Sequence, residues 1–130
     1  MNQDELIAEV VRICDQAEPP IRWISLVAVR KERCPHLEGW PDLFLLGSAG
    51  FCWREVKTGS TRLTAAQGRW LDAIEDAGGA ADIWTERDLY DGSIRAELLK
   101  LNGVAVEREP WIPEGASPDE AAHRRAVYGS

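Results

Sequence analysis

The feature that most constrains the fold of this 130-residue chain is a pair of apolar segments joined by a turn bounded by glycines. The segments span residues 42–46 and 51–57, and both contain large aliphatic and aromatic side chains. The four residues between them, 47–50, begin and end with glycine, which is typical of a short hairpin connection. The chain is therefore predicted to contain a β-hairpin, whose side chains alternate between the two faces of a sheet.

A sharply bounded helix is predicted after the hairpin. Thr64 and Gln67 have the spacing of a capping box, in which two side chains satisfy backbone donors at a helix start. One apolar face runs through residues 64–77, and Gly78-Gly79 is a typical helix end. Residues 81–85 then predict a strand, placed after the helix as in a right-handed crossover between parallel strands.

The N-terminal region adds a helix and a strand. Apolar residues recur with a helical period over residues 4–17, and Pro19-Pro20 ends the pattern. Residues 21–29 are rich in β-branched and aromatic side chains, which is typical of a strand, and residues 30–39 are predicted to be a loop. The predicted order is αβββαβ, an α/β core with a mixed sheet flanked by helices.

The C-terminal region is predicted to be less regular. Apolar spacing indicates a short helix over residues 94–101, with Ser93 as a candidate N-cap. Two prolines within residues 109–113 favour an extended arm. Residues 117–120 place Ser, Pro and Glu where an N-cap, a first helical residue and a capping-box acid are expected, which predicts a final helix.

Length and composition fit one compact domain over residues 1–106, followed by a C-terminal arm and helix, residues 107–130, that pack against it or oligomerise. No apolar run approaches the roughly 20 residues of a membrane span, and the N-terminus lacks the pattern of a signal peptide. We therefore expect a cytoplasmic protein. The odd number of cysteines, without a CxxC pair, favours reduced thiols.

The net charge of −7 argues against a nucleic-acid partner, because DNA affinity comes mainly from Lys and Arg neutralising phosphates. The acidic residues are, however, concentrated towards the two ends of the chain. Arg30, Lys31 and Arg33 form a basic segment between them and are candidate phosphate contacts, although an ordinary solvated loop explains them equally well. We expect DNA binding to be weak and salt-sensitive, or to be assisted by a partner.

Asp42, Glu55 and Lys57 form the strongest candidate site. On the predicted hairpin, Glu55 and Lys57 share one face, and Asp42 begins the partner strand. Two carboxylates are hard oxygen ligands that suit Mg²⁺ or Mn²⁺, and a nearby amine can stabilise phosphate charge. These residue types therefore indicate metal-assisted cleavage of a phosphodiester. Alternatively, Asp42 caps a turn while Glu55 and Lys57 form an exposed pair.

Further segments strengthen this interpretation: Gly39-Trp40-Pro41-Asp42-Leu43, Arg54-Glu55-Val56-Lys57-Thr58, Leu63-Thr64-Ala65-Ala66-Gln67, Trp70-Leu71 and Trp84. Together they resemble the VRR-NUC branch of the PD-(D/E)xK nucleases, the restriction-endonuclease-like superfamily, over about residues 20 to 90. The resemblance implies a restriction-endonuclease-like core and a divalent-metal-dependent endonuclease that cuts DNA. Small stand-alone relatives are typical of bacteriophages, some act on branched DNA, and many are homodimers.

The resemblance also implies roles for individual residues. Asp42 and Glu55 match the acids that bind the metal ion, and Val56 matches the position whose backbone carbonyl completes the ion's shell. Lys57 matches the catalytic lysine. Gln67 matches a helix glutamine found near the active site, a role that is compatible with helix capping because a helix N-terminus also favours phosphate.

One position departs from the family pattern. The glutamate usually found early in helix one aligns with Gln3. Glu5 and Glu9 lie four residues apart on one face of that helix, so either is a candidate for the third carboxylate, and Glu9 is a candidate catalytic residue. A solvated acidic stripe explains both residues as well. If the third carboxylate is missing, the alternative is a weak or inactive nuclease-fold module that binds DNA or a phage replication or recombination protein.

Overall fold

The computed structural model describes residues 1–27 and 34–129 and has an α/β architecture. Its sheet has four strands in the order of the chain: β1 (Arg22–Ser25), β2 (Leu43–Leu46), β3 (Phe51–Lys57) and β4 (Ala81–Thr85). The first three strands pair in antiparallel fashion, and β4 is parallel to β3. The predicted mixed sheet and the αβββαβ order are therefore confirmed.

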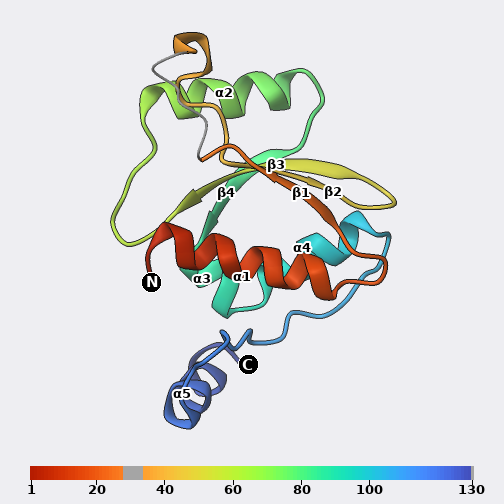
Figure 1. Cartoon of the computed structure of the whole chain (residues 1–130), viewed down its shortest axis with the longest axis vertical. Coiled ribbons are helices and arrows are strands. Elements are labelled where there is room, and N and C mark those ends of the chain that lie inside the picture. Colours follow the sequence, from red (N-terminus) through yellow and green to blue (C-terminus); the bar gives the residue numbers. More distant parts are fainter. Residues whose placement is uncertain (28–33, 130) are drawn as a thin grey trace.

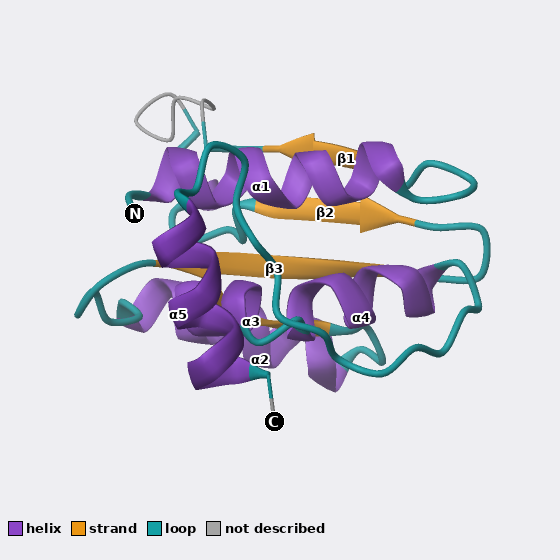
Figure 2. Ribbon diagram, turned by 90° about the horizontal axis from the view of Figure 1, so that it is seen from below, coloured by secondary structure: helices purple, strands orange, loops and turns teal. Residues whose placement is uncertain are grey.

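Helices cover both faces of the sheet. They are α1 (Gln3–Gln16), α2 (Ala65–Asp76), α3 (Glu86–Tyr90), α4 (Ser93–Leu101) and α5 (Pro118–Tyr128), with a 3-10 helix, η2 (Pro35–Leu37), before β2. Figure 1 shows α2 above the sheet, α1, α3 and α4 below it, and α5 beyond them. Seen from below, α1 lies in front of β1 and β2 with its axis roughly along the strands, and α4 lies in front of the other half of the sheet (Figure 2). Within the described part of the chain, no helix is long and apolar enough to cross a bilayer.

The main core lies between the sheet and α1, α3 and α4. In the β2–β3 register Leu43 is opposite Arg54 and Leu45 is opposite Cys52, so Leu43, Leu45 and Cys52 point to the same face. They are buried with the apolar faces of the helices on that side: Leu6, Val10 and Ile13 of α1, Leu89 of α3, and Ile94 and Leu98 of α4. The apolar side chains on one face of the hairpin and those on one face of α1 therefore pack together in a single core.

Two of the three cysteines belong to this core. Cys14 and Cys52 are buried and Cys34 is half-buried, and all three are free thiols. Burial, aided by the charge of Asp15, raises the pKa of the Cys14 thiol to about 12. Burial also raises the pKa of the Cys52 thiol. Both buried thiols are thus neutral packing groups at physiological pH.

Local sequence explains several helix starts, but one helix and one N-cap residue differ from the prediction. Thr64 and Ser117 cap α2 and α5 as predicted. Helix α3 was not predicted, although Thr85 and Asp88 form a capping box at its start. Gly92, not Ser93, is the N-cap of α4. Gly92 has φ +84°, and a Cβ atom there would overlap the backbone of the C-terminal arm, which explains the glycine.

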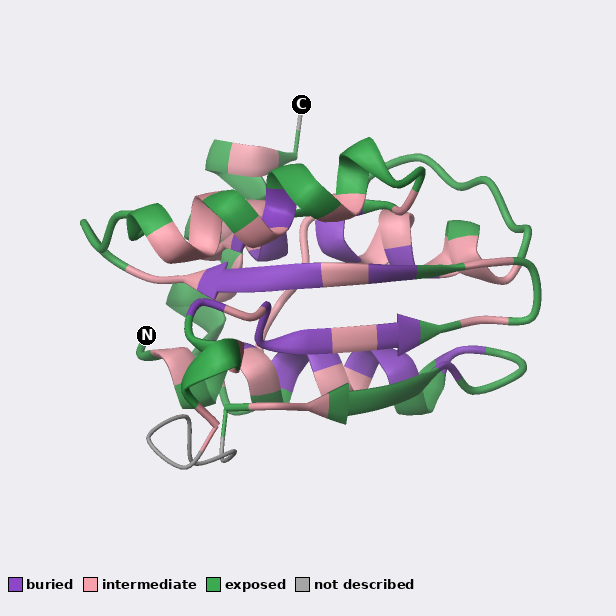
Figure 3. Ribbon diagram, turned by 90° about the horizontal axis from the view of Figure 1, so that it is seen from above, coloured by how far each residue is buried: buried purple, intermediate pink, exposed green. Residues whose placement is uncertain are grey.

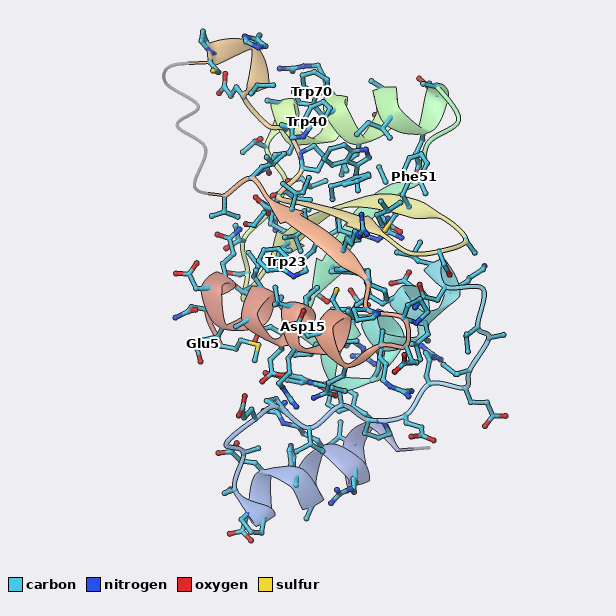
Figure 4. All side chains as sticks on the ribbon, turned by 45° about the vertical axis from the view of Figure 1, so that its right-hand side comes forward. Glu5, Asp15, Trp23, Trp40, Phe51 and Trp70 are labelled. Carbon is cyan, nitrogen blue, oxygen red and sulfur yellow. The ribbon has the colours of Figure 1, made fainter. Side chains whose placement is uncertain are left out.

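The α2 face of the sheet is only partly covered. Helix α2 packs against β4, leaving side chains of β1, β2 and the start of β3 accessible. Ile24 and Phe51 are each 54% exposed and Leu46 is 37% exposed, and β1 is mostly exposed in Figure 3. Phe51 lies on the side of the sheet nearer α2, whereas Trp23 points towards α1 (Figure 4). We call Ile24, Leu46 and Phe51 the exposed apolar face.

The C-terminal arm is held against α1 by a buried carboxylate. Glu9 is 8% exposed and accepts hydrogen bonds from Arg12 Nε (3.0 Å), Trp111 Nε1 (2.9 Å) and the Glu114 backbone N–H (2.8 Å). The Arg12 guanidinium lies 4.6 Å from the centroid of the Trp111 ring and donates to the Ile112 carbonyl at 3.1 Å. Glu9 therefore connects the first helix to the arm.

Replacing Glu9 with Ala should release this arm. The change leaves a half-buried guanidinium, an indole N–H and a backbone N–H without their shared acceptor, which should cost about 2 to 4 kcal/mol. Thermal unfolding should show the loss of stability, and limited proteolysis should cut near residues 104–116. Asp15→Ala, an exposed acid on the same helix, is the control. Equal proteolysis of the two variants would contradict the role of Glu9.

Candidate active site

Asp42 connects β2 with the chain after β1 and with β3, at the open end of the hairpin. Its carboxylate is almost fully buried, and Oδ2 accepts a hydrogen bond from the Val56 backbone N–H at 2.9 Å. Its own carbonyl accepts from the Leu26 N–H at 2.7 Å. Asp42 therefore extends the pairing of β2 with both neighbouring strands. It bonds to the chain after β1 through its backbone carbonyl and to β3 through its side chain. The carboxylate is fixed beside Val56 as a result.

Glu55 and Lys57 lie on the same face of β3, as the sequence predicted. Glu55 is 1% exposed, and its Oε1 atom lies 3.7 Å from Lys57 Nζ. The same Oε1 atom accepts a hydrogen bond from Gln67 Nε2 at 3.2 Å. The alternative interpretation of Glu55 and Lys57 as an exposed pair is therefore wrong, since the Glu55 carboxylate is buried and is also bound by the Gln67 side chain of α2.

Gln67 caps α2 and positions Glu55 at the same time. Its Oε1 atom accepts from the Thr64 backbone N–H at 2.9 Å, and its own backbone N–H donates to Thr64 Oγ1 at 3.1 Å. Because Thr64 N–H requires an oxygen, the amide must present its nitrogen to Glu55. The capping interpretation and the active-site interpretation of Gln67 therefore describe one set of contacts.

Gln3 is the residue of α1 that reaches the site. It is the first residue of the helix, and its Nε2 atom lies 3.2 Å from Asp42 Oδ2 and 3.5 Å from the Val56 carbonyl oxygen. The resemblance stated above matched Gln3 with a helix-one glutamate, and the structure places the Gln3 side chain beside Asp42 and Val56. No other signal in the sequence identified it.

The two acids predicted as substitutes lie elsewhere. Glu5 is exposed and forms a capping box with Asn2. Glu9 follows Gln3 by six residues, which is about 9 Å along the helix, and its carboxylate is bound to Arg12 and the C-terminal arm. The structure therefore does not bring Glu9, the predicted catalytic residue of α1, to Asp42 and Glu55.

The loop before Asp42 is docked on the start of α2. The Glu38 carbonyl accepts from Trp70 Nε1 at 2.8 Å, and the Trp40 and Trp70 rings are 4.4 Å apart (Figure 4). Gly39 has φ +82°, and a Cβ atom there would lie 2.5 Å from the Ala66 carbonyl carbon. Only glycine permits this approach. The sequence interpretation missed this contact, although Gly39 lay within the motif.

The donor set fits a divalent cation of the Mg²⁺ or Mn²⁺ type. The Asp42 carboxylate and the Val56 carbonyl both lie within reach of one Gln3 amide nitrogen, so these two oxygens converge on a shared position. Glu55 adds a buried carboxylate from the neighbouring residue of β3. Hard oxygen donors of this kind suit Mg²⁺ and Mn²⁺. Among residues 1–27 and 34–129, no group of three His, Cys, Asp or Glu side chains is suitably placed to bind a metal ion.

The N-termini of two helices lie at the site and stabilise its negative charge. Gln3 is at the N-terminus of α1, and Gln67 is in the first turn of α2. The backbone N–H groups at a helix N-terminus favour carboxylates and phosphates. Of the four basic residues predicted to act here, Lys57 is at the site, and Arg30, Lys31 and Arg33 lie outside the described residues.

Comparison of the chain with protein-family models, with curated proteins and with solved structures finds no match. The geometry of the site is therefore the basis for inferring what the protein does.

Replacing Gly39 with Ala should displace the loop that carries Asp42. The new Cβ atom meets Ala66 and Gln67 and also strains a left-handed residue, so we expect a loss of about 3 kcal/mol or more. Gly59→Ala is a matched control, because Gly59 also has positive φ (+60°) but nothing lies within 4 Å of the added Cβ. It should cost only about 1 kcal/mol in chemical denaturation. Equal losses would show that the contact with α2 is unimportant.

Proposed function

We propose that this protein is a divalent-metal-dependent endonuclease that hydrolyses phosphodiester bonds in DNA. One observation carries the proposal: the buried Asp42 carboxylate is bound to the backbone of Val56, which lies on β3 between the buried Glu55 carboxylate and the Lys57 amine. Asp42 is fixed by Val56 N–H, and Glu55 lies between Gln67 and Lys57. Burying two acids in this way is costly unless positive charge compensates them. Lys57 offsets one acid, and a bound divalent cation would offset the remainder.

Each residue has a distinct part in the proposed reaction. Asp42, Glu55 and the Val56 carbonyl would hold Mg²⁺ or Mn²⁺. Such a cation, when bound, polarises a phosphate and makes water a better nucleophile. Lys57 donates a hydrogen bond to the attacking water or to a phosphate oxygen, since its amine lies next to Glu55. Gln67 keeps Glu55 in place through its amide nitrogen.

The acidic composition is compatible with this proposal. The acidic residues of the C-terminal arm and α5 lie beyond α1, on the far side of that helix from the sheet (Figure 1). A bound divalent cation would also reverse part of the negative charge at the site. The family resemblance extends the proposal to branched or structured DNA, to a homodimer, and to a bacteriophage protein acting in the host cytoplasm.

Cleavage assays test the proposal directly. Labelled duplex, single-stranded and four-way-junction DNA should be cut in the presence of Mg²⁺ or Mn²⁺ and left intact with excess chelator. Asp42→Asn keeps an acceptor for Val56 N–H but removes a charge, and Lys57→Ala removes the amine, so each should lower the rate about 10²- to 10³-fold. Lys100→Ala, an exposed lysine at the end of α4, should cleave like wild type. If no substrate is cut with either metal, the enzyme proposal is wrong.

One observation favours a second function. Ile24, Leu46 and Phe51 form the exposed apolar face, and an exposed apolar patch is typical of a protein-binding surface. The net charge of −7 opposes DNA binding, so this face favours the protein-binding form of the alternative, a weak or inactive nuclease-fold module that binds a phage replication or recombination protein. In such a module, the site would contribute to recognition without cleavage.

Serine substitutions at Ile24 and Phe51 separate the two functions. Both side chains are largely exposed, so the double variant should remain folded, with a stability change of about 1 kcal/mol or less. If the face is a binding surface, sedimentation velocity should show weaker self-association or weaker binding to a partner than wild type. Val104→Ser, a 42% exposed residue outside both this face and the C-terminal arm and helix, is the control. An unchanged sedimentation profile together with metal-dependent cleavage would contradict the binding function and support only the enzyme function.

A further inference from the structure

The Gln3 side chain lies where the oxygens of the site converge. Its amide nitrogen is within hydrogen-bonding distance of Asp42 Oδ2 and of the Val56 carbonyl, at 3.2 Å and 3.5 Å. These are two of the three groups assigned to a cation in the proposed function. The N–H groups of Gln3 therefore occupy the electrostatic position that a cation would take.

Helix capping does not explain the position of this side chain. The Asn2 side chain accepts from the Glu5 backbone N–H at 2.8 Å, and the Glu5 carboxylate accepts from the Asn2 backbone N–H at 3.2 Å. This capping box serves the start of α1 without Gln3. The hydrogen bonds of Gln3 instead extend to Asp42, just before β2, and to Val56 of β3, 39 and 53 residues away in sequence.

The present orientation of the amide is incompatible with a bound cation. An N–H group carries positive charge at its hydrogen, so it is repelled by a cation that shares the same oxygen acceptors. The terminal torsion of a glutamine has a broad, roughly two-fold preference. A half-turn about it exchanges nitrogen for oxygen with little movement of other atoms and directs Oε1 towards the cation.

We propose that Gln3 is a metal-responsive positioning residue, whose amide stabilises the metal-free site through its nitrogen and turns to offer its oxygen when a divalent cation binds. The proposal rests on the cation site of the proposed function. It adds a fourth oxygen donor, which is uncharged, so that the side chains of the site supply two negative charges. Cation affinity falls with fewer charged ligands, so the ion binds less tightly here than at a site with three acids, and a substrate phosphate adds further affinity.

Calorimetric titration of the full chain with Mn²⁺, without DNA, tests the proposal. Gln3→Glu adds a charge to this donor and should tighten Mn²⁺ binding about tenfold or more. Gln3→Ala removes the donor and should weaken binding several-fold. Gln16→Glu, which adds the same charge at the exposed far end of α1, should bind like wild type. Opposite shifts in the two Gln3 variants support the proposal, whereas unchanged or parallel shifts overturn it.

A second measurement uses the wild-type protein, so it does not depend on how the variants fold. In nuclear magnetic resonance spectra, titration with Mg²⁺ should shift the side-chain N–H signals of Gln3 together with the backbone N–H signal of Val56. The side-chain signals of Gln16 should stay in place. If the Val56 signal shifts while the Gln3 signals do not, the amide does not respond to the cation and the proposal is wrong.

The two proposals can fail separately. If the Gln3 variants shift Mn²⁺ affinity as expected but no DNA is cut, the nuclease function is wrong and the role of Gln3 stands. If cleavage requires Asp42 and Lys57 while both Gln3 variants bind Mn²⁺ like wild type, the nuclease function stands and the role of Gln3 is wrong. If the wild-type protein shows no saturable Mn²⁺ binding, the role of Gln3 is also overturned.

Discussion

The hydrogen bond from the Val56 backbone N–H to the Asp42 carboxylate, at 2.9 Å, is the contact on which the site depends. It replaces a main-chain contact at the end of the β2–β3 hairpin with a side-chain contact. A carboxylate is thereby held against the strand that carries Glu55 and Lys57. Without this bond, Asp42 would be free to turn towards solvent, and a buried cation site would lose one of its two acids.

Two amides hold the two acids, and both come from helix starts. Gln3 of α1 contacts Asp42, and Gln67 of α2 contacts Glu55. The sheet is thus clamped at one end by a helix from each face. The positions of the two carboxylates therefore depend on the positions of the two helix starts. Gly39 adds a further contact at this end of the sheet, because its backbone lies against Ala66 and Gln67 of α2.

Local sequence predicted the parts of the site but not all of their contacts. The turn of residues 47–50 set the hairpin, and the Thr64–Gln67 spacing located the start of α2, since turns and caps depend on neighbours in sequence. The packing of Gly39 on Ala66 and the binding of Glu9 by Trp111 join residues far apart in the chain. A helical period cannot tell a carboxylate that faces a site from one that faces an arm, which is why Glu9 was misplaced.

The central claim is that Asp42, Glu55 and the Val56 carbonyl form one divalent-cation site. Anomalous diffraction from crystals grown with Mn²⁺ tests it most directly, because the ion's position is measured without assuming any activity. We predict one anomalous peak between these three groups, at coordination distances of about 2.0 to 2.3 Å from their oxygen atoms. Full Mn²⁺ occupancy at other positions, with no peak between these oxygens, would contradict the account.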